Sequence, residues 1–127
     1  MYWMFLFFFT LPYSPVDVEL NYPSQYSYEV GRWYPLVEYV LDVYDLEDEL
    51  STFMRVLHCE SRGDPNAVNP SSGTTGLMQH MPRYWPERAA QAGFSGLPAN
   101  NPVANIYASA WLLKLPDIGG WKHWECY

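Results

Sequence analysis

The chain has 127 residues, of which 49% are hydrophobic and 18% aromatic, and its formal net charge is −7. This length allows one domain with a substantial hydrophobic core, and the apolar content argues against a disordered chain. The negative charge argues against a nucleic-acid-binding protein, because such proteins present a basic surface.

The acidic residues are concentrated in the first part of the chain. Residues 1–50 carry nine acidic side chains and one basic one, whereas residues 51–127 carry five acidic and six basic side chains. The balance of the second part is compatible with an anionic polymer as partner. The abundant aromatic residues suit either an aromatic-rich core or a groove in which sugars stack on flat rings.

Residues 1–11, MYWMFLFFFTL, are apolar except at Thr10. The stretch is too short to span a bilayer, and it lacks both a basic flank and a clear cleavage site. Three interpretations stay open: an atypical export signal, a segment that contacts a membrane, a virion or another partner, and a strand packed on its own domain. We favour the first two. Residues 17–31 predict an extended linker, so we divide the chain into a hydrophobic segment with an acidic linker at 1–31 and a domain at 32–127.

Apolar spacing and end signals predict a mainly α fold for this domain. One helix starts near Pro35, and a second follows Asp45 as N-cap and stops at Gly63. A third runs from about Pro86 to Gly93, and a long fourth runs from an Asn101 cap to Leu115. The fourth is apolar on nearly all sides, which indicates a central, buried helix. No strand pattern of any length is present.

Glu60 is the candidate for an unusual carboxyl group. It follows Phe53 by seven residues and Val56 by four, so it projects near the apolar face of its helix. Apolar surroundings disfavour the charged form, raise the pKa and keep a proton available for general acid catalysis. An exposed carboxylate at a frayed helix end is the plainer alternative.

Three further residues allow more than one interpretation. Asn105 lies on the buried helix and must find a hydrogen-bond partner, which is either a loop carbonyl or a substrate amide. Cys59 and Cys126 form one disulfide or remain separate buried thiols. A zinc site with His58 and His123 is a weaker option, because the spacings CxxC and HxxxH are absent. We therefore expect no metal and no other cofactor.

Several motifs in a fixed order resemble the soluble lytic transglycosylase (SLT) type of lysozyme-like domain. These are ES at Glu60-Ser61, NPSSGTTGLMQHMP at 69–82 and NPVANI at 101–106 at the head of the long helix. The resemblance covers about residues 35–127. It implies a small lysozyme-like fold in which the long Gly/Pro/Ser/Asn loop forms one side of a glycan cleft.

The resemblance also implies roles for individual residues. Glu60 would be the catalytic acid and base, and Ser61 would help to orient its carboxylate. The loop would line the cleft through Ser72, Gly76 and Gln79. Two further cleft residues are expected from the later part of the chain, namely Asn105 and an aromatic ring supplied by Tyr84 or Tyr107, since the AYNAG-like segment of the family is absent.

The last residues, GGWKHWECY, are similar instead to the end of resuscitation-promoting factors. In those proteins a Cys beside the catalytic Glu forms a disulfide with a Cys in a tail that also contains two Trp residues. Carried over, this implies that Cys59 pairs with Cys126 and holds the end of the chain against the catalytic helix.

The implied reaction is cleavage of the MurNAc-GlcNAc β-1,4 bond of peptidoglycan. No second acid is spaced convincingly to assist Glu60, and Asp64 is more consistent with a turn. A single acid suffices if the C6 hydroxyl of the sugar closes a 1,6-anhydro ring. The alternatives are a hydrolytic lysozyme-type muramidase and an inactive wall-binding or virion module. We expect a monomeric catalytic domain that is secreted and cell-wall-associated, or else virion-associated.

Overall fold

The structure is a computed structural model that describes residues 21–127. Residues 1–20 lie outside this part, so the structure does not test the three interpretations of residues 1–11. The described chain is helical, in the order α2 (Tyr28–Gly31), α3 (Tyr34–Val43), α4 (Leu50–Ser61), α5 (Trp85–Gln91) and α6 (Pro102–Lys114). Short 3-10 turns precede α4 at Glu47–Glu49 (η2) and follow α6 at Trp121–His123 (η3). Between residues 21 and 127 the only β pairing consists of isolated bridges.

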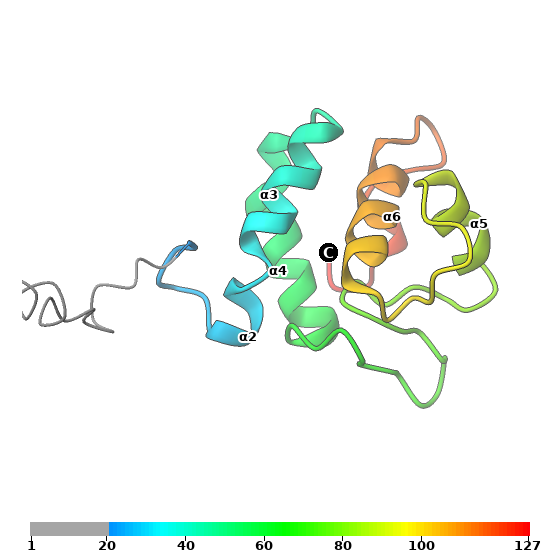
Figure 1. Ribbon diagram of the computed structural model, residues 1–127, viewed down its shortest axis with the longest axis horizontal. Coiled ribbons are helices and arrows are strands. Elements are labelled where there is room, and N and C mark those ends of the chain that lie inside the picture. Colours follow the sequence, from blue (N-terminus) through cyan, green and yellow to red (C-terminus); the bar gives the residue numbers. More distant parts are fainter. Residues whose placement is uncertain (1–20) are drawn as a thin grey trace, which may run out of the picture.

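The helix predictions are confirmed for α3, α5 and α6. Pro35 lies in the first turn of α3, and the Asn101 side chain caps α6 by accepting a hydrogen bond from the Ala104 amide at 3.0 Å. Buried residues lie on most sides of α6, as expected for a central helix. Figure 1 shows α3 and α4 side by side, with α6 between them and α5.

Asp45 is not the N-cap that the sequence predicts. Its φ is 55°, and it belongs to the end of α3, where the Leu46 amide bonds the Leu41 carbonyl at 2.8 Å. This bond closes α3 with a left-handed residue, a conformation that Asp tolerates better than most side chains. The acidic residues after it form the η2 turn, and α4 therefore begins only at Leu50.

The linker expected up to Gly31 is also shorter than predicted. Ser27 caps α2, and Val30 is buried in the main core. Gly63, at the end of α4, lies directly against α2, where a Cβ would stand 2.1 Å from the Glu29 carbonyl oxygen. The close approach of two backbones explains why the residue after the Arg62 cap of α4 is glycine. The division of the chain at residue 32 stays a prediction.

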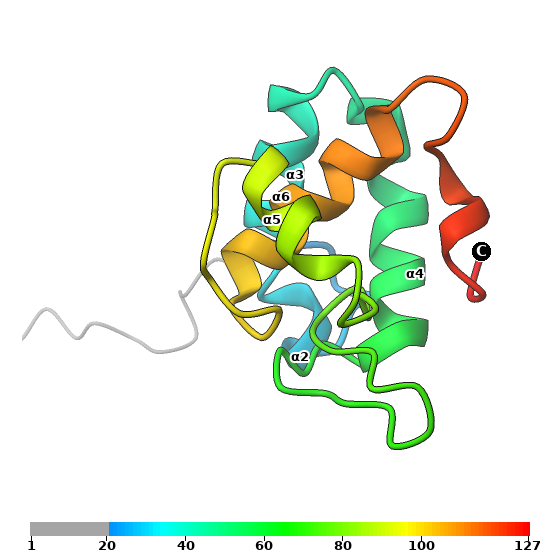
Figure 2. The ribbon, with the colours of Figure 1, turned by 90° about the vertical axis from the view of Figure 1, so that its right-hand side faces the viewer.

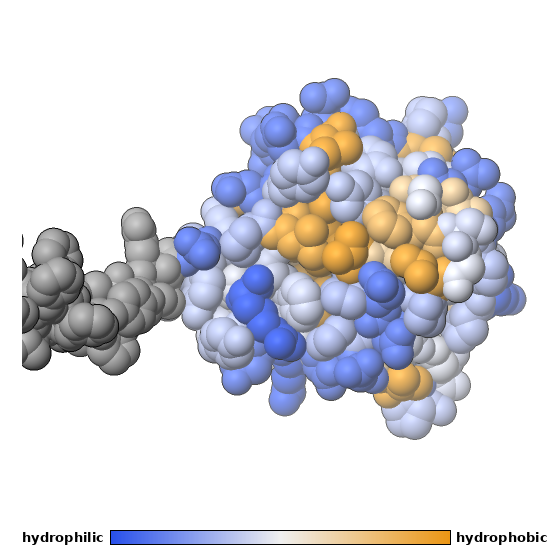
Figure 3. All heavy atoms as spheres, viewed as in Figure 1, coloured by the Kyte–Doolittle hydropathy of each residue, from blue (hydrophilic) through white to orange (hydrophobic). Residues whose placement is uncertain are grey.

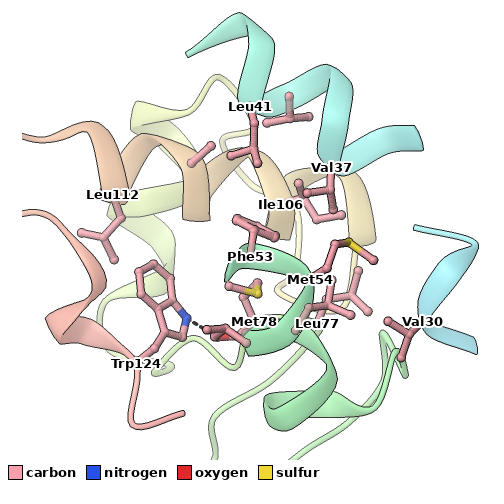
Figure 4. Close-up of a cluster of buried hydrophobic side chains, with 14 residues drawn as sticks. Val30, Val37, Leu41, Phe53, Met54, Leu77, Met78, Ile106, Leu112 and Trp124 are labelled. Atoms are coloured by element: carbon pink, nitrogen blue, oxygen red, sulfur yellow. Dashed lines mark hydrogen bonds between the residues drawn. The ribbon is translucent and has the colours of Figure 1, made fainter. Parts of the chain in front are cut away.

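The main core joins α3, α4 and α6 to the loop after α4 and to the C-terminal tail, which we define as residues 119–127 (Figure 4). Phe53, Leu77 and Ile106 are fully buried in it, and Trp124 brings the tail into contact with them. A second, smaller cluster packs α5 on α6 through Trp85 and three alanines. The core thus lies directly behind the last turn of α4, which carries Glu60.

Much of the face shown in Figure 3 is hydrophilic, although apolar side chains gather near its centre. The large apolar residues that are exposed include Tyr39, Val43 and Ile118. Within residues 21–127, the helices are too short or too polar for any of them to cross a membrane.

Candidate active site

Three segments that are distant in the sequence enclose a cleft of about 540 Å³. Its base is the last turn of α4, with Cys59 and Glu60. The loop between α4 and α5 forms one wall, and the C-terminal tail forms the other; Figure 2 shows this tail running alongside α4. The lining residues are Cys59, Glu60, Asn69, Ser71, Ser72, Thr74, Gln79, Met81, His123, Trp124, Glu125 and Cys126.

Glu60 is half-buried at the base of this cleft. Burial raises the pKa of its carboxyl group above the ordinary value. A backbone hydrogen bond from Cys126 acts in the opposite direction, and the negative charge of Glu125 raises the pKa further. A carboxyl group in such surroundings retains its proton nearer to neutral pH than an exposed one, which is the property required of a general acid.

The tail is held against α4 by one covalent and two polar contacts. Cys59 and Cys126 form a disulfide with their Cα atoms 5.9 Å apart, so the pairing implied by the resemblance is present. The Arg55 guanidinium donates to the Cys126 carbonyl at 3.2 Å, and the indole of Trp121 donates to Glu49 at 2.8 Å. The tail therefore forms a fixed wall of the cleft.

Trp124 links the tail to the opposite loop. Its indole N–H donates to the Met78 carbonyl at 2.8 Å, and its ring is buried (Figure 4). This bond joins the two walls behind the cleft, since Met78 immediately precedes Gln79.

Hydroxyl and amide groups give the loop wall its polar character. Ser72 and Thr74 hydrogen-bond each other at 3.0 Å, and Thr74 donates to the Gln79 side-chain oxygen at 2.9 Å. The Gln79 amide nitrogen donates to the carbonyls of Ala67 and Gly76 at 3.0 and 2.9 Å. These bonds hold Gln79 in place at a φ of 52°, and its oxygen retains acceptor capacity toward the cleft.

Ser61, Gly76 and Asn105 support the site from behind and do not line the cleft. The Ser61 hydroxyl donates to the Leu57 carbonyl at 3.2 Å and accepts from the Gly63 amide at 3.2 Å, so it serves the end of α4. Asn105 accepts from the Met78 amide at 2.9 Å and donates to the Ala99 carbonyl at 2.9 Å. Of the two interpretations of Asn105, the structure shows the bond to loop carbonyls.

The two tyrosines expected in the cleft lie elsewhere. Tyr84 precedes α5 and contacts the guanidinium groups of Arg83 and Arg88. Tyr107 packs between Tyr44 and Phe94. The aromatic residues that do line the cleft are His123 and Trp124 of the tail, of which only His123 is exposed, because the Trp124 ring is buried in the main core.

Glu125 is a second acid in this cleft that sequence spacing did not identify. It is exposed, it lines the same cleft, and its charge acts on Glu60. Neither Asp64 nor Asp117 lines the cleft; Asp64 accepts from the Asn66 amide at 2.9 Å in a turn. The expected pairing of Cys59 with Cys126 is the sequence signal that could have identified Glu125, because these cysteines are the chain neighbours of Glu60 and Glu125.

No group of three or more His, Cys, Asp and Glu side chains suited to a metal ion occurs between residues 21 and 127. The sulfur atoms of the two cysteines are bonded to each other. The polar groups of the cleft are therefore carboxyl, hydroxyl, amide and imidazole groups. This set is suited to hydrogen-bonding a polar chain and to proton transfer.

The chain that forms this cleft is similar to known proteins. Residues 44–123 match the family described as "Transglycosylase SLT domain". The chain is also similar to the protein named "Probable transglycosylase SceD" of Staphylococcus aureus strains Newman and USA300, with 41% identity over 66 residues in each case. The matched segment covers 51% of this chain and 27% of each relative, so the chain spans about a quarter of the length of these relatives. The likeness of the tail to resuscitation-promoting factors stays a prediction.

Proposed function

Because the chain belongs to the transglycosylase SLT domain family, we propose that it cleaves the MurNAc-GlcNAc β-1,4 bond of peptidoglycan as a lytic transglycosylase. The observation that carries this proposal is the position of Glu60. Its carboxyl group is half-buried at the base of a polar cleft, and its pKa is raised chiefly by burial.

The reaction divides into two proton transfers at Glu60. The protonated carboxyl group donates to the glycosidic oxygen while the bond from C1 of MurNAc to that oxygen breaks. The resulting carboxylate accepts the proton of the C6 hydroxyl as its oxygen bonds to C1. The products are a free GlcNAc 4-hydroxyl and a 1,6-anhydro ring, and no water is consumed. Because ring closure is intramolecular, orientation of the sugar takes the place of a bound nucleophile.

The two walls supply the groups that orient the glycan strand. Ser72 and Gln79 on the loop are suited to hydrogen-bond N-acetyl and hydroxyl groups. The tail offers the exposed ring of His123, against which the apolar face of a sugar can pack. Tyr84 and Tyr107 do not line the cleft, and Ser61 and Asn105 stabilise the segments that form it.

A hydrolytic muramidase is the second candidate, and Glu125 is the observation that favours it. A second carboxylate in the cleft can activate a water molecule, as in glycosidases that use two acids. Hydrolysis leaves a reducing MurNAc end, whereas the transglycosylase reaction leaves the anhydro end. The two products differ by the mass of one water.

The proposed substrate implies a place of action. Peptidoglycan lies outside the cytoplasmic membrane, so we place the active protein there, associated with the cell wall or carried by a virion. We further propose that residues 1–11 contact a membrane or a virion, and that the catalytic domain is a monomer.

The test is turnover of purified peptidoglycan by the wild type and by Glu60→Gln. An amide of the same shape cannot donate the proton, so we expect activity to fall by about 10²-fold or more while the variant still sediments with peptidoglycan. Glu38→Gln, an exposed position on α3, is the matched control and should act as the wild type. Substantial turnover by Glu60→Gln would remove Glu60 from the mechanism.

The same digests identify the reaction. Separation of the released muropeptides with mass detection should show 1,6-anhydro ends as the main product. Predominantly reducing ends would make the protein a hydrolase.

A further inference from the structure

Three side chains of the loop wall form a continuous hydrogen-bonded relay, which we define as Ser72, Thr74 and Gln79. All three line the cleft. The Thr74 hydroxyl lies 3.0 Å from the Ser72 hydroxyl and donates to the Gln79 side-chain oxygen at 2.9 Å. The Thr74 backbone amide also donates to the Ser72 hydroxyl, at 3.3 Å. The relay therefore connects one lining residue to the next along this wall.

The orientation of the Gln79 side-chain amide follows from its partners. Its nitrogen lies 3.0 and 2.9 Å from the carbonyl oxygens of Ala67 and Gly76, and neither of these residues lines the cleft. Carbonyl oxygens only accept, so the atom that faces them is the nitrogen, and both of its hydrogens are used. The Gln79 side chain thus has no hydrogen to donate to a ligand. Its oxygen, bonded to a residue that lines the cleft, keeps one lone pair free of Thr74.

The same reasoning gives the direction of the other bond in the relay. A hydroxyl group has one hydrogen, and Thr74 gives its own to the Gln79 oxygen. The Ser72 hydroxyl is therefore the donor to Thr74, so its single hydrogen is used as well. Every donor among the three side chains is bound within the protein, and the relay offers only oxygen lone pairs to a ligand.

We propose that Thr74 is a positioning residue for glycan binding, which holds the Gln79 oxygen so that it accepts a hydrogen bond from an N–H or O–H group of the sugar. The proposal deepens the proposed function and rests on it, since it takes a glycan as the ligand. In this role Thr74 acts through Gln79. A ligand that presents a carbonyl oxygen at this point is disfavoured, because two acceptors would then face each other.

The first measurement follows the side-chain amide of Gln79 by NMR in the free, intact protein. Both of its hydrogens are bonded, so they should exchange with solvent at least about tenfold more slowly than those of Gln91, which is exposed on α5. Thr74→Val keeps the shape of the side chain but removes the hydroxyl. It should shift the Gln79 amide signals and accelerate their exchange.

Thr75→Val is the matched control. The Thr75 hydroxyl belongs to the same loop and donates to the Gly73 carbonyl at 2.9 Å, but Thr75 does not line the cleft. Each variant loses one hydroxyl hydrogen bond of the loop, so their stabilities in urea should be similar. Only Thr74→Val should alter the Gln79 amide, and a difference between the two variants therefore reports the relay and not the fold.

The second measurement is calorimetric binding of a soluble glycan, chitohexaose, a β-1,4-linked oligomer of N-acetylglucosamine. Glu60→Gln serves as the parent protein, so that the oligomer is not cleaved. Thr74→Val in this parent should weaken binding by about three- to tenfold, the usual effect of one neutral hydrogen bond. Thr74→Ser restores the hydroxyl and should bind within about twofold of the parent, as should Thr75→Val.

A glucose oligomer of the same linkage, cellohexaose, identifies the donor group of the sugar. It carries hydroxyls in place of acetamido groups. Weaker binding of both oligomers by Thr74→Val would assign a sugar hydroxyl as the donor, and weaker binding of chitohexaose alone would assign the acetamido N–H.

Two outcomes would overturn the proposal. Gln79 amide hydrogens that exchange as fast as those of Gln91 would show that the amide is not held in this orientation. Equal affinities of Thr74→Val and Thr75→Val for chitohexaose would show that Thr74 does not position a binding group. Neither measurement needs turnover, so both judge this proposal even if Glu60→Gln still cleaves peptidoglycan and the proposed function fails.

Discussion

At the scale of single residues, Asn105 and Gly76 determine the shape of the loop wall. Asn105 is fully buried on α6 and bonds three backbone groups of the preceding segments, those of Thr75, Met78 and Ala99. Gly76 has a φ of 89°, and a Cβ there would stand 2.2 Å from the Asn105 amide nitrogen and 2.3 Å from the Ala99 carbonyl oxygen. Only glycine combines this backbone conformation with this approach.

Replacement of Gly76 tests this contact. Gly76→Ala should lower the free energy of unfolding by about 2–4 kcal/mol, because it adds both left-handed strain and a steric clash. Gly93→Ala is the matched control: its φ is 92°, but no heavy atom lies within 4 Å of the added Cβ. The control should lose only about 1 kcal/mol. Urea denaturation measures both, and equal losses would contradict the role of the Asn105 contact.

At the scale of elements, the tail and α4 behave as a unit. The tail has no long helix of its own, yet it supplies one wall of the cleft through His123, Trp124 and Glu125. Arg55 also lies over the Tyr127 ring, which stacks on Trp121 at 5.4 Å between ring centroids. Noncovalent contacts along its length thus accompany the disulfide.

Removal of the disulfide tests how much the covalent link adds. Changing Cys59 and Cys126 together to Ser should cost roughly 2–4 kcal/mol of stability, since the bond closes a long loop in the unfolded chain. The Trp124 and Trp121 hydrogen bonds should keep the folded tail in place at low denaturant. Urea denaturation gives the stability, and mass spectrometry of unreduced peptides shows the bond in the wild type. A double variant as stable as the wild type would show that the noncovalent contacts suffice.

At the scale of the whole molecule, His80 connects the loop to both α5 and α6. Its Nδ1 faces the Arg88 guanidinium at 3.0 Å, and its Nε2 faces the Ser109 hydroxyl at 2.7 Å. Arginine can only donate, so Nδ1 accepts and the Nε2–H donates to Ser109, which in turn donates to the Asn105 carbonyl at 2.8 Å. The ring is therefore neutral, and burial, with the charge of Arg88, lowers its pKa to about 3.

This network predicts a pH-dependent stability of the whole fold. The His80 pKa falls from 6.5 in the unfolded chain to about 3 in the folded one, so between these values the unfolded chain binds more protons. The stability that the neutral His80 ring contributes is complete above its pKa of 6.5 in the unfolded chain. It is lost as the pH falls toward the pKa of about 3 in the folded chain, by up to roughly 4 kcal/mol. Urea denaturation from pH 7 to pH 3 measures it.

One variant separates His80 from the other titrating groups. His80→Gln cannot gain this charge, so its stability should depend less on pH over the same range, although it starts lower at pH 7. An identical pH slope in wild type and His80→Gln would exclude His80 as the source.

Features that depend on neighbours along the chain were predictable from the sequence. The start of α3, the bounds of α6, the Asn101 cap and the buried nature of α6 follow from apolar spacing and end signals, and the structure confirms them. The position of Glu60 near the apolar face of its helix follows from the same helical period. The family motifs depend on residue order, and the match over residues 44–123 agrees with them.

The rest required the tertiary structure, because it depends on which distant segments meet. Asp45 could cap the next helix or close the preceding one, and packing of α3 against α4 decided for the second. Tyr84 and Tyr107 have suitable chemistry for the cleft but face other elements. Glu125 lines the same cleft as Glu60 only because the tail folds back along α4 and is bonded there. The spacing of residues within one segment cannot predict this packing of the tail on α4, because the disulfide and Trp124 in the shared core stabilise it.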